Sequence, residues 1–393
     1  MSSFPSLYRA LVIGAGVTGL TTARCLQERG FAVTVIAHRF QHQTTSVVAG
    51  ALWEWPPAVC GFYEIAPAQA LRDEQRWCLE SYHRFQRLST KMATGVYIRP
   101  VVFYLETPAA ENALEMRKIN ELRPNVSGFA HDAALVRRNG VNPEAGYVDA
   151  YTYQTPLVDT DMYLAWLLAE VLSNGATIEQ RQVHGPLSAA VHELQSSYRA
   201  DVVVNCTGLG SRELADDQII PVRGAWLLAE NDGKRFPKIT TAHCSSLINS
   251  ASGGTFLFIV PRGRDRLILG GIAQPECWST NLGPAHGSIS RAIFEKCAAF
   301  MPGLRSAEMV DRGQLRVGLR PFRRAGVRVE REHALPIVHN YGHGGSGVTL
   351  SWGAASDAAL LAQSAIAGFE EEAAPGAQDE PVRAVPERLS RNI

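Results

Sequence analysis

The sequence predicts an α/β protein in which two domains are built from alternating stretches of the chain. Three glycine-rich turns, at Gly14–Gly19, Thr207–Gly210 and Gly342–Gly347, each follow a short apolar run typical of a buried parallel strand. Segments rich in charged and aromatic residues, with strand-like patterning, lie between them. Because the turns are far apart in the chain, they indicate one large ligand contacted by distant segments.

The N-terminal segment has the pattern of a complete strand–helix–strand unit. Residues 9–13 form an apolar strand, a helically spaced apolar stripe follows the first glycine turn, and residues 31–36 alternate as a second strand. In such a Rossmann-like unit the glycines let the backbone approach a pyrophosphate, which the N-terminus of the helix stabilises. The residues predicted to bind a dinucleotide here are Gly14, Gly16, Val17, Thr18 and Gly19.

The two domains are predicted to interleave along the chain. Strand and helix patterns like those of the N-terminal unit assign residues 1–55, 155–215 and 315–368 to the cofactor-binding domain. The β-rich residues 56–154 and 216–314 are assigned to a mixed β-sheet domain that would hold the substrate. The remaining residues, 369–393, are charged and rich in Pro and Ala, which predicts a disordered tail.

The end of the second strand leaves two cofactors open. An acidic residue usually stands there and binds the ribose hydroxyls. Here the strand ends in Ala37, His38 and Arg39, and no Asp or Glu occurs between Glu28 and Glu54. Arg39 could meet the 2′-phosphate of NADP, or His38 and Arg39 could lie near the adenosine of FAD.

The third glycine turn favours FAD. A reduced isoalloxazine ring carries negative charge, and backbone N–H groups at a helix N-terminus stabilise such charge. Gly347, Val348 and Thr349 are predicted to supply these groups at the start of the last helix. A nicotinamide enzyme has no need for a second site of this kind.

Composition excludes several classes of partner. The chain has 393 residues, 46% of them hydrophobic, with 38 basic and 38 acidic residues. A formal charge of zero provides no field that would attract nucleic acid or an anionic membrane. No apolar run is long enough to span a bilayer, the first residues do not resemble a secretory signal, and the last three are no peroxisomal address. We therefore expect a cytoplasmic protein, with a homodimer left open.

The glycine turns and the segments around them resemble the D-amino-acid oxidase family. The resemblance covers residues 11–361 and keeps the order of the motifs. The segments that carry it are IGAGVTGL, TTSVVAGALW (44–53), NCTG (205–208), VGLRPFR (317–323) and HNYGHGGSGVTLSWG (339–353).

The resemblance implies FAD as the cofactor and assigns its contacts. Thr44, Thr45 and Ser46 would hold the pyrophosphate or the ribityl chain, and the backbone of Val183 would meet the adenine. The motifs further assign to the cofactor site Ala49, Gly50, Thr207, Gly208, Gly344, Gly345, Gly347, Val348 and Thr349.

The reaction implied is the oxidation of a D-amino acid to an imino acid, which hydrolyses to a 2-oxo acid and ammonia. The Cα hydrogen would leave as hydride to flavin N5, and molecular oxygen would become hydrogen peroxide. Arg320 is predicted to bind the substrate carboxylate, because a guanidinium is planar, bidentate and permanently charged. The carbonyl of Gly345 would receive the substrate amine, so no acid–base side chain is required.

Some positions depart from the family or carry two interpretations. Phe258 stands where the family has a tyrosine, which makes the pocket more apolar; it is a candidate site residue or plain core. Ser346 replaces a bulkier aromatic residue and would open the site. Glu54 could favour a cationic substrate or be a hydrogen-bonded structural carboxylate. His339 and His343 straddle a glycine loop without nearby acids or cysteines, so no metal site is predicted.

The sequence is compatible with three other functions. The substrate could be another amine, such as glycine, a secondary amino acid or a biosynthetic intermediate. The protein could be an NADP-dependent dehydrogenase. It could also bind a flavin as a sensor or scaffold without turnover.

Overall fold

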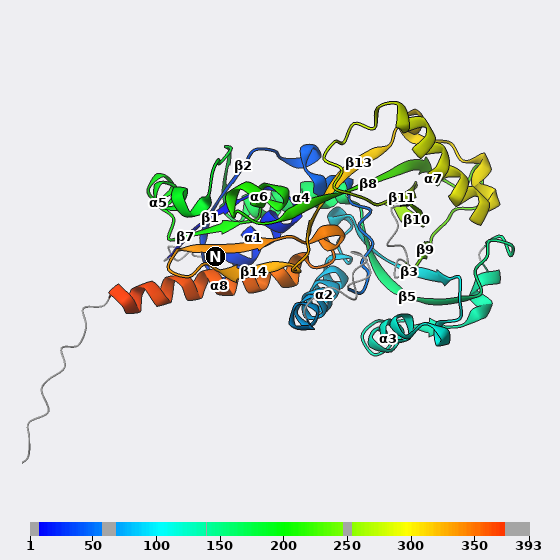
Figure 1. The fold of residues 1–393 in the computed structure, drawn as a ribbon, viewed down its shortest axis with the longest axis horizontal. Helices are drawn as coiled ribbons and strands as arrows, with labels where there is room; N and C mark the ends of the chain where they lie inside the picture. The colour runs from blue at the N-terminus through cyan, green and yellow to red at the C-terminus, as the bar shows by residue number, and fades with distance from the viewer. Residues whose placement is uncertain (1–7, 57–67, 139, 247–253, 374–393) are drawn as a thin grey trace, which may run out of the picture.

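A six-stranded sheet forms one half of the molecule in the computed structural model, which describes residues 8–56, 68–138, 140–246 and 254–373 (Figure 1). Its strand order is β14-β15-β7-β1-β2-β6, and all neighbours pair in parallel except β14 with β15. The strands are β1 (Arg9–Ile13), β2 (Ala32–Ala37), β6 (Thr177–Gln180), β7 (Val202–Asn205), β14 (Arg328–Arg331) and β15 (Ile337–Tyr341). The predicted Rossmann-like opening is confirmed.

Helices cover both faces of this sheet, as the continuous apolar run of β1 requires. Ala10 and Val12 point into a core shared with α1 (Val17–Glu28) and α8 (Ser351–Ala373). Leu11 and Ile13 point the other way, into a core shared with α5 (Leu187–Tyr198). Helix α4 (Thr160–Ser173) packs beside α1.

A second sheet of nine strands forms the other half. Its order is β12-β8-β11-β10-β9-β3-β5-β4, with β13 on the opposite edge of β8. The strands are β3 (Val96–Leu105), β4 (Ala130–His131), β5 (Asp149–Val158), β8 (Ile219–Glu230), β9 (Ala242–Ser245), β10 (Thr255–Arg262), β11 (Arg266–Ile272), β12 (Gln274–Pro275) and β13 (Arg316–Arg323). The mixed β-sheet part of the predicted fold is thus also confirmed.

The two faces of the second sheet have different coverings. Helix α7 (His286–Phe300) packs on one face around Leu227, Ile259 and Leu269. The other face turns its aromatic side chains toward α2 (Ala68–Leu88), α3 (Ala113–Leu122) and the segment that carries Trp53. The short helix α6 (Ser211–Leu214) follows β7.

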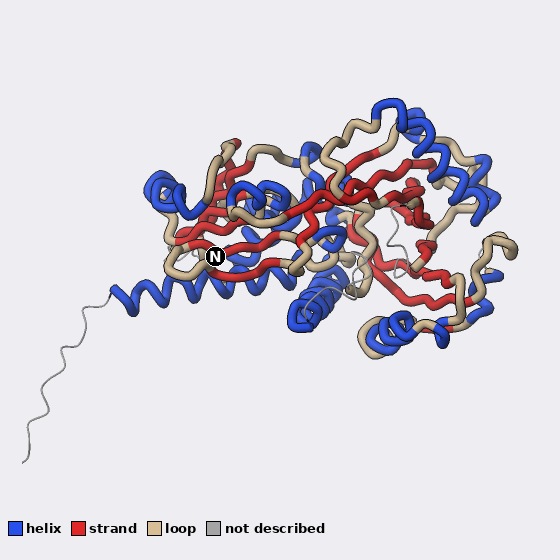
Figure 2. The backbone as a smooth tube through the Cα atoms, viewed as in Figure 1, coloured by secondary structure: helices blue, strands red, loops and turns tan. Residues whose placement is uncertain are grey.

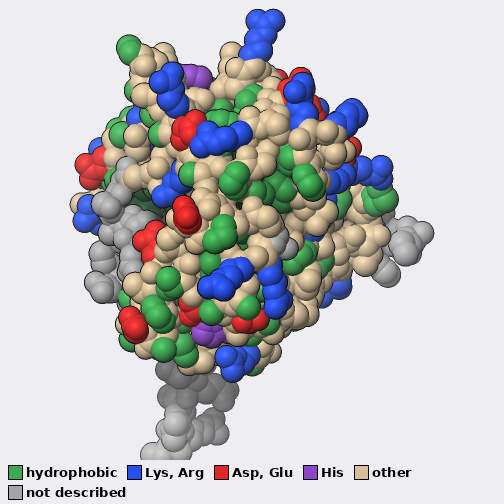
Figure 3. Space-filling view, turned by 90° about the vertical axis from the view of Figure 1, so that its right-hand side faces the viewer, with side chains coloured by type: hydrophobic (Ala, Val, Ile, Leu, Met, Phe, Trp, Pro, Cys, Tyr) green, Lys and Arg blue, Asp and Glu red, His purple; other side chains and the backbone are tan. Residues whose placement is uncertain are grey.

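The two sheets lie side by side along the long axis of the molecule (Figure 2). The end formed by the second sheet carries Lys and Arg side chains interspersed with acidic and apolar ones (Figure 3). Within the described ranges, no helix combines the length and the apolar character needed to cross a membrane.

Two elements cross the domain boundaries that the sequence predicts. Strand β13 pairs with β8 along its whole length, so the segment from residue 315 enters the second sheet before β14 and β15 return to the first. The last helix begins regularly at Ser351 and continues to Ala373, so the first residues of the predicted tail are helical. The rest of that tail, residues 374–393, lies outside the described residues.

Candidate active site

A cavity of about 820 Å³ lies where segments of both sheets meet, and it collects the three glycine turns. Its walls also include the end of β2, the segment that follows it, and parts of β8, β10 and β13. Both sheets therefore contribute to one elongated site, as the distant motifs predicted.

The first glycine turn is closed by contacts that only glycine allows. Gly14 has a φ of +113°, and a Cβ atom there would lie 2.4 Å from the carbonyl oxygen of Cys206. A Cβ on Gly19 would lie 1.8 Å from the carbonyl oxygen of Gly14. Gly16, Val17 and Thr18 line the cavity together with Gly14. Gly19 was also predicted to bind the cofactor; it is not among the residues that line the cavity, and the carbonyl of Gly14 occupies the space that a side chain on Gly19 would need.

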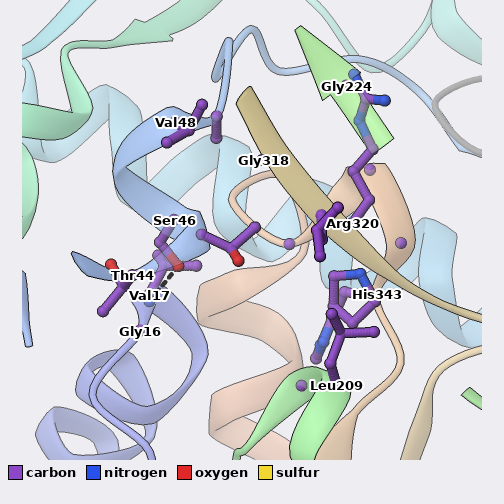
Figure 4. Close-up of a pocket in the computed structure, with 18 of the residues that line it drawn as sticks. Gly16, Val17, Thr44, Ser46, Val48, Leu209, Gly224, Gly318, Arg320 and His343 are labelled. Carbon is purple, nitrogen blue, oxygen red and sulfur yellow. Dashed lines mark hydrogen bonds between the residues drawn. The ribbon is translucent and has the colours of Figure 1, made fainter. Parts of the chain in front are cut away.

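The segment from Thr44 to Gly50 lies against the start of α1. The Oγ atom of Ser46 accepts a hydrogen bond of 2.9 Å from the backbone N–H of Val17, and Figure 4 shows Thr44 and Ser46 beside this helix start. The cavity-lining residues of the segment include Thr44, Thr45, Ser46, Ala49 and Gly50. All five predicted contact positions thus lie on the cavity wall.

The second sheet holds this segment in place. The indole N–H of Trp226 donates a 2.7 Å hydrogen bond to the carbonyl of Val48. The buried Arg262 donates to the carbonyl of Ala49 at 3.0 Å and pairs with Asp159 at 3.2 Å. Sequence patterns gave no indication of these contacts, because their partners are far apart in the chain.

One end of the cavity is lined by residues after β2 and β6. His38, Arg39 and Val183 all lie there, as predicted. The carboxylate of Glu213 on α6 also lines this end and accepts a 2.7 Å hydrogen bond from the N–H of Gly185. The end of β2 has no acidic residue, but the carboxylate of Glu213 on α6 lies in the wall of the same cavity.

The second glycine turn is fixed from behind by polar side chains. The Oδ1 atom of Asn205 accepts hydrogen bonds from the N–H and the hydroxyl of Thr207, at 3.2 and 2.8 Å. Asn205 also meets Nδ1 of His339 at 3.3 Å, and Nε2 of His339 meets Glu332 at 2.8 Å. His339 is therefore satisfied by hydrogen bonds, whereas Thr207 and Gly208 line the cavity.

The third glycine turn brings five backbone positions to the cavity wall. These are Gly344, Gly345, Gly347, Val348 and Thr349. The N–H of Leu350 already bonds the carbonyl of Ser346 at 2.9 Å, although the regular helix begins only at Ser351. The predicted helix start at Gly347 is thus an irregular helical turn. Its N–H groups can still face a ligand, as the N–H groups at any helix start do.

His343 and Ser346 have different positions around this turn. His343 lines the cavity and is buried, and burial lowers the pKa of its imidazole to about 4, so the ring is neutral at physiological pH. Ser346 is also buried, and the wall beside it is formed by Gly345 and Gly347. That the small side chain of Ser346 opens the site stays a prediction.

Arg320 lies on β13 and reaches across β8 toward β11. Its Nη1 donates a 3.2 Å hydrogen bond to the carbonyl of Ile272, and the side chain lines the cavity (Figure 4). A Cβ atom on Gly224 would lie 2.6 Å from the guanidinium. Glycine at position 224 thus makes room for the guanidinium on the surface of the sheet.

The other arginines of this stretch pair with carboxylates away from the cavity. Arg323 is held by Asp217 at 2.8 Å, and Arg316 by Asp161 at 3.3 Å. Arg328 pairs with Glu330 and, at 3.5 Å, with Glu332, and Arg324 is 3.9 Å from Glu276. Among the five arginines, Arg320 lines the cavity.

Phe258 and Glu54 both line the cavity. The ring of Phe258 covers the backbone of Gly50, where a Cβ atom would lie 2.7 Å from the ring. Glu54 is buried, and its Oε1 is 2.7 Å from Nζ of Lys118, a fully buried lysine on α3. Glu54 is thus a hydrogen-bonded carboxylate, as one of its two interpretations expects, and it also lines the cavity, so a role in substrate preference stays a prediction.

Comparison with known proteins identifies the family of this chain. Residues 9–361 match the family described as FAD dependent oxidoreductase. A D-amino-acid oxidase of Rubrobacter xylanophilus is 37% identical over 91% of this chain and 97% of its own length. The chain belongs to the D-amino-acid oxidase family of FAD-dependent oxidoreductases.

Other relatives agree with this assignment. A D-amino-acid oxidase of Streptomyces coelicolor is 37% identical over 90% of this chain and 96% of its own length. A human D-aspartate oxidase is 30% identical over 90% of this chain and 94% of its own length. The glycine oxidase of Bacillus cereus has a similar fold, with a TM-score of 0.70, 17% identity, and coverage of 91% of this chain and 95% of that chain.

Membership of the D-amino-acid oxidase family makes the protein an enzyme, a FAD-dependent amino acid oxidase. The residues present fit FAD, because Gly14 and Gly16 keep side chains away from the start of α1 and residues of all three glycine turns line one cavity. Within the described ranges, no cluster of His, Cys, Asp or Glu is arranged to hold a metal ion.

Proposed function

We propose that this enzyme oxidises D-amino acids to imino acids, which hydrolyse to 2-oxo acids and ammonia. The observation that carries the proposal is the guanidinium of Arg320 on the cavity wall beside the third glycine turn. The curated D-amino-acid oxidases that are 37% identical over about nine-tenths of the chain support the choice of substrate.

Arg320 would bind the substrate carboxylate through two parallel hydrogen bonds. The carbonyl of Gly345 would accept a hydrogen bond from the α-amine, which must be neutral to lose hydride from the adjacent carbon. Phe258 would pack against the substrate and exclude water from that face. Together these contacts hold Cα in one orientation, so that position and electrostatics provide the rate enhancement.

Bound FAD supplies the hydride acceptor, and molecular oxygen then takes the electrons and leaves as hydrogen peroxide. The first turn and the segment that contains Ser46 would hold the pyrophosphate, because N–H groups at a helix start stabilise phosphate charge. His38, Arg39 and Val183 would surround the adenosine. Gly347, Val348 and Thr349 would face the flavin ring.

Peroxide release from the FAD-loaded enzyme tests this proposal. The screen pairs D- and L-enantiomers of each amino acid and adds glycine and N-methyl amino acids. We expect turnover of D-amino acids above all others, and anaerobic bleaching of the flavin absorption by the same compounds. Preference for glycine, N-methyl amines or L-amino acids would overturn the choice of substrate, and failure of every compound to bleach the flavin would support a protein without turnover.

A further inference from the structure

We propose that Glu54 and its partner Lys118 form a subsite for the cationic end of a long substrate side chain. The inference rests on the proposed function, in which Arg320 binds the substrate carboxylate. It adds to that function a substrate class, namely D-amino acids with a basic side chain.

The carboxylate of Glu54 is bound by a buried lysine and belongs to a residue of the cavity wall. Oε1 is held 2.7 Å from Nζ of Lys118. This hydrogen bond uses Oε1, and Glu54 itself lines the cavity. Lys118 is fully buried and lies 4.6 Å from the centre of the Phe103 ring. A carboxylate held by Lys118 is therefore part of the cavity wall.

Near Lys118, the described carboxylates outnumber the described ammonium groups. A second buried carboxylate, Glu115, is influenced by both Lys118 and Glu54 and accepts a hydrogen bond from Ser246. Its other oxygen, Oε2, is buried without a partner among the described residues. Among the described residues, two carboxylates thus lie near one ammonium group. A second cation would balance the cluster, whereas leaving buried charge uncompensated is costly.

The distance from Arg320 suits a long side chain. The guanidinium is bonded to the carbonyl of Ile272 on β11. On β10 Phe258 pairs with Cys244 of β9, and Cys244 in turn pairs with Phe103, which lies under Lys118. Phe103 is on β3, three strand spacings from β11, but the charge of Glu54 also acts on the thiol of Cys244 on β9, which is two spacings, about 10 Å, from β11. A substrate whose carboxylate meets Arg320 and whose lysine-like four-carbon stem crosses Phe258 brings its ammonium to Glu54.

Burial raises the pKa of Glu115, which fixes the expected pH dependence. Below that pKa Glu115 is neutral, and Lys118 balances Glu54 alone. Above it the cluster carries one excess negative charge. The preference for a cationic side chain should therefore increase as the pH rises through the pKa of Glu115.

The kinetic test compares D-lysine with D-norleucine, which has nearly the same shape without the charge. For the FAD-loaded enzyme we expect kcat/KM to favour D-lysine at least tenfold, and Glu54→Gln to lower that ratio at least tenfold. Glu121→Gln is the matched control. Glu121 lies on α3, the helix that carries Lys118, and its carboxylate accepts a hydrogen bond from the indole N–H of Trp55. The ratio for D-lysine over D-norleucine should not change in this variant. If removing Glu54 damages folding, the double variant Glu54→Gln, Lys118→Met removes both charges at once.

A binding measurement separates this subsite from the proposed reaction. 6-Aminohexanoate and hexanoate lack the α-amine and are not oxidised, so their affinities follow from perturbation of the flavin absorption alone. We expect tighter binding of 6-aminohexanoate, lost in both Glu54 variants. Equal affinities together with equal turnover of D-lysine and D-norleucine would overturn the subsite. If no D-amino acid is oxidised, the proposed function fails, while the binding ratio still decides the subsite.

Discussion

At the scale of single residues, Arg320 is the side chain on which substrate binding should depend most. Arg320→Leu removes the bidentate partner of the carboxylate, and we expect KM to rise about 100-fold, roughly 3 kcal/mol of binding. The affinity for FAD should remain within about twofold, since the first-turn contacts are untouched. Arg324→Leu, on the exposed end of the same stretch, is the matched control. A KM in Arg320→Leu close to that of the wild type would contradict the assignment.

A substitution at Gly224 tests the role of Arg320 while the arginine itself is kept. A Cβ atom at this position would overlap the guanidinium, which is the flexible end of a side chain and can move. For Gly224→Ala we therefore expect a KM about tenfold higher with a melting temperature within a few degrees of the wild type. Steady-state kinetics and thermal unfolding of the same preparation provide both values. A large loss of stability with normal KM would place the guanidinium elsewhere in the active enzyme.

The sequence could identify Arg320 but not the partners of Glu54. Arg320 stands in a recognisable motif, and its residue type is suited to a carboxylate. Lys118 lies in a helix with alternating charged and apolar residues, where a lysine is expected to be exposed. Only the packing of α3 against Phe103 and Tyr151 buries it. Similarly, the role of Gly19 in helix packing became visible only with the position of Gly14.

At the scale of elements, helix α8 depends on close contact with α2. A Cβ atom on Gly353 would lie 2.2 Å from the backbone of Trp77, which cannot move as a side-chain end can. For Gly353→Ala we expect a destabilisation of about 1–3 kcal/mol or more, because the two helices must separate. Gly287→Ala is the control, since α7 has open space at that position. It should be neutral or stabilise by about 0.5–1 kcal/mol. Chemical denaturation of both variants measures the difference, and equal stabilities would refute the close contact.

Local patterns predicted most elements, whereas long-range pairing decided the rest. The first strand, helix and second strand follow from apolar spacing and glycine position within one short segment. Strand β13 pairs with β8, and this pairing places Arg320 in the second sheet. The alternation of residues along β13 also puts Arg320 and Gly318 on one face. Such choices depend on partners nearly a hundred residues away, which a single sequence does not specify.

At the scale of the whole molecule, buried histidines should make the protein sensitive to acid. Burial lowers the pKa of His243 to about 4, from a value near 6.5 in the unfolded chain. Between these values the unfolded state binds a proton that the folded state does not. Stability is therefore fully present above about pH 6.5 and decreases as the pH falls toward 4.

His243→Gln tests this dependence, because it removes one titrating group next to Tyr104. We expect the slope of the unfolding free energy against pH, between pH 6 and 4.5, to decrease by about 1 kcal/mol per pH unit. Urea unfolding at several pH values measures the slope. An unchanged slope would mean that His243 titrates normally in the folded protein.

FAD should stabilise the entire molecule, because the walls of its cavity come from both sheets. A ligand that binds only the folded state adds about 2.7 kcal/mol at a free concentration 100 times its Kd, enough to raise the melting temperature by roughly 5 °C. We expect this increase for the cofactor-free protein with FAD and not with NADP. Gly16→Ala should reduce it, because a Cβ atom there would lie 3.0 Å from Oγ of Ser46 and face the pyrophosphate site. A larger increase with NADP than with FAD would contradict the assignment of the cavity, and an equal response in Gly16→Ala would move the pyrophosphate away from the first turn.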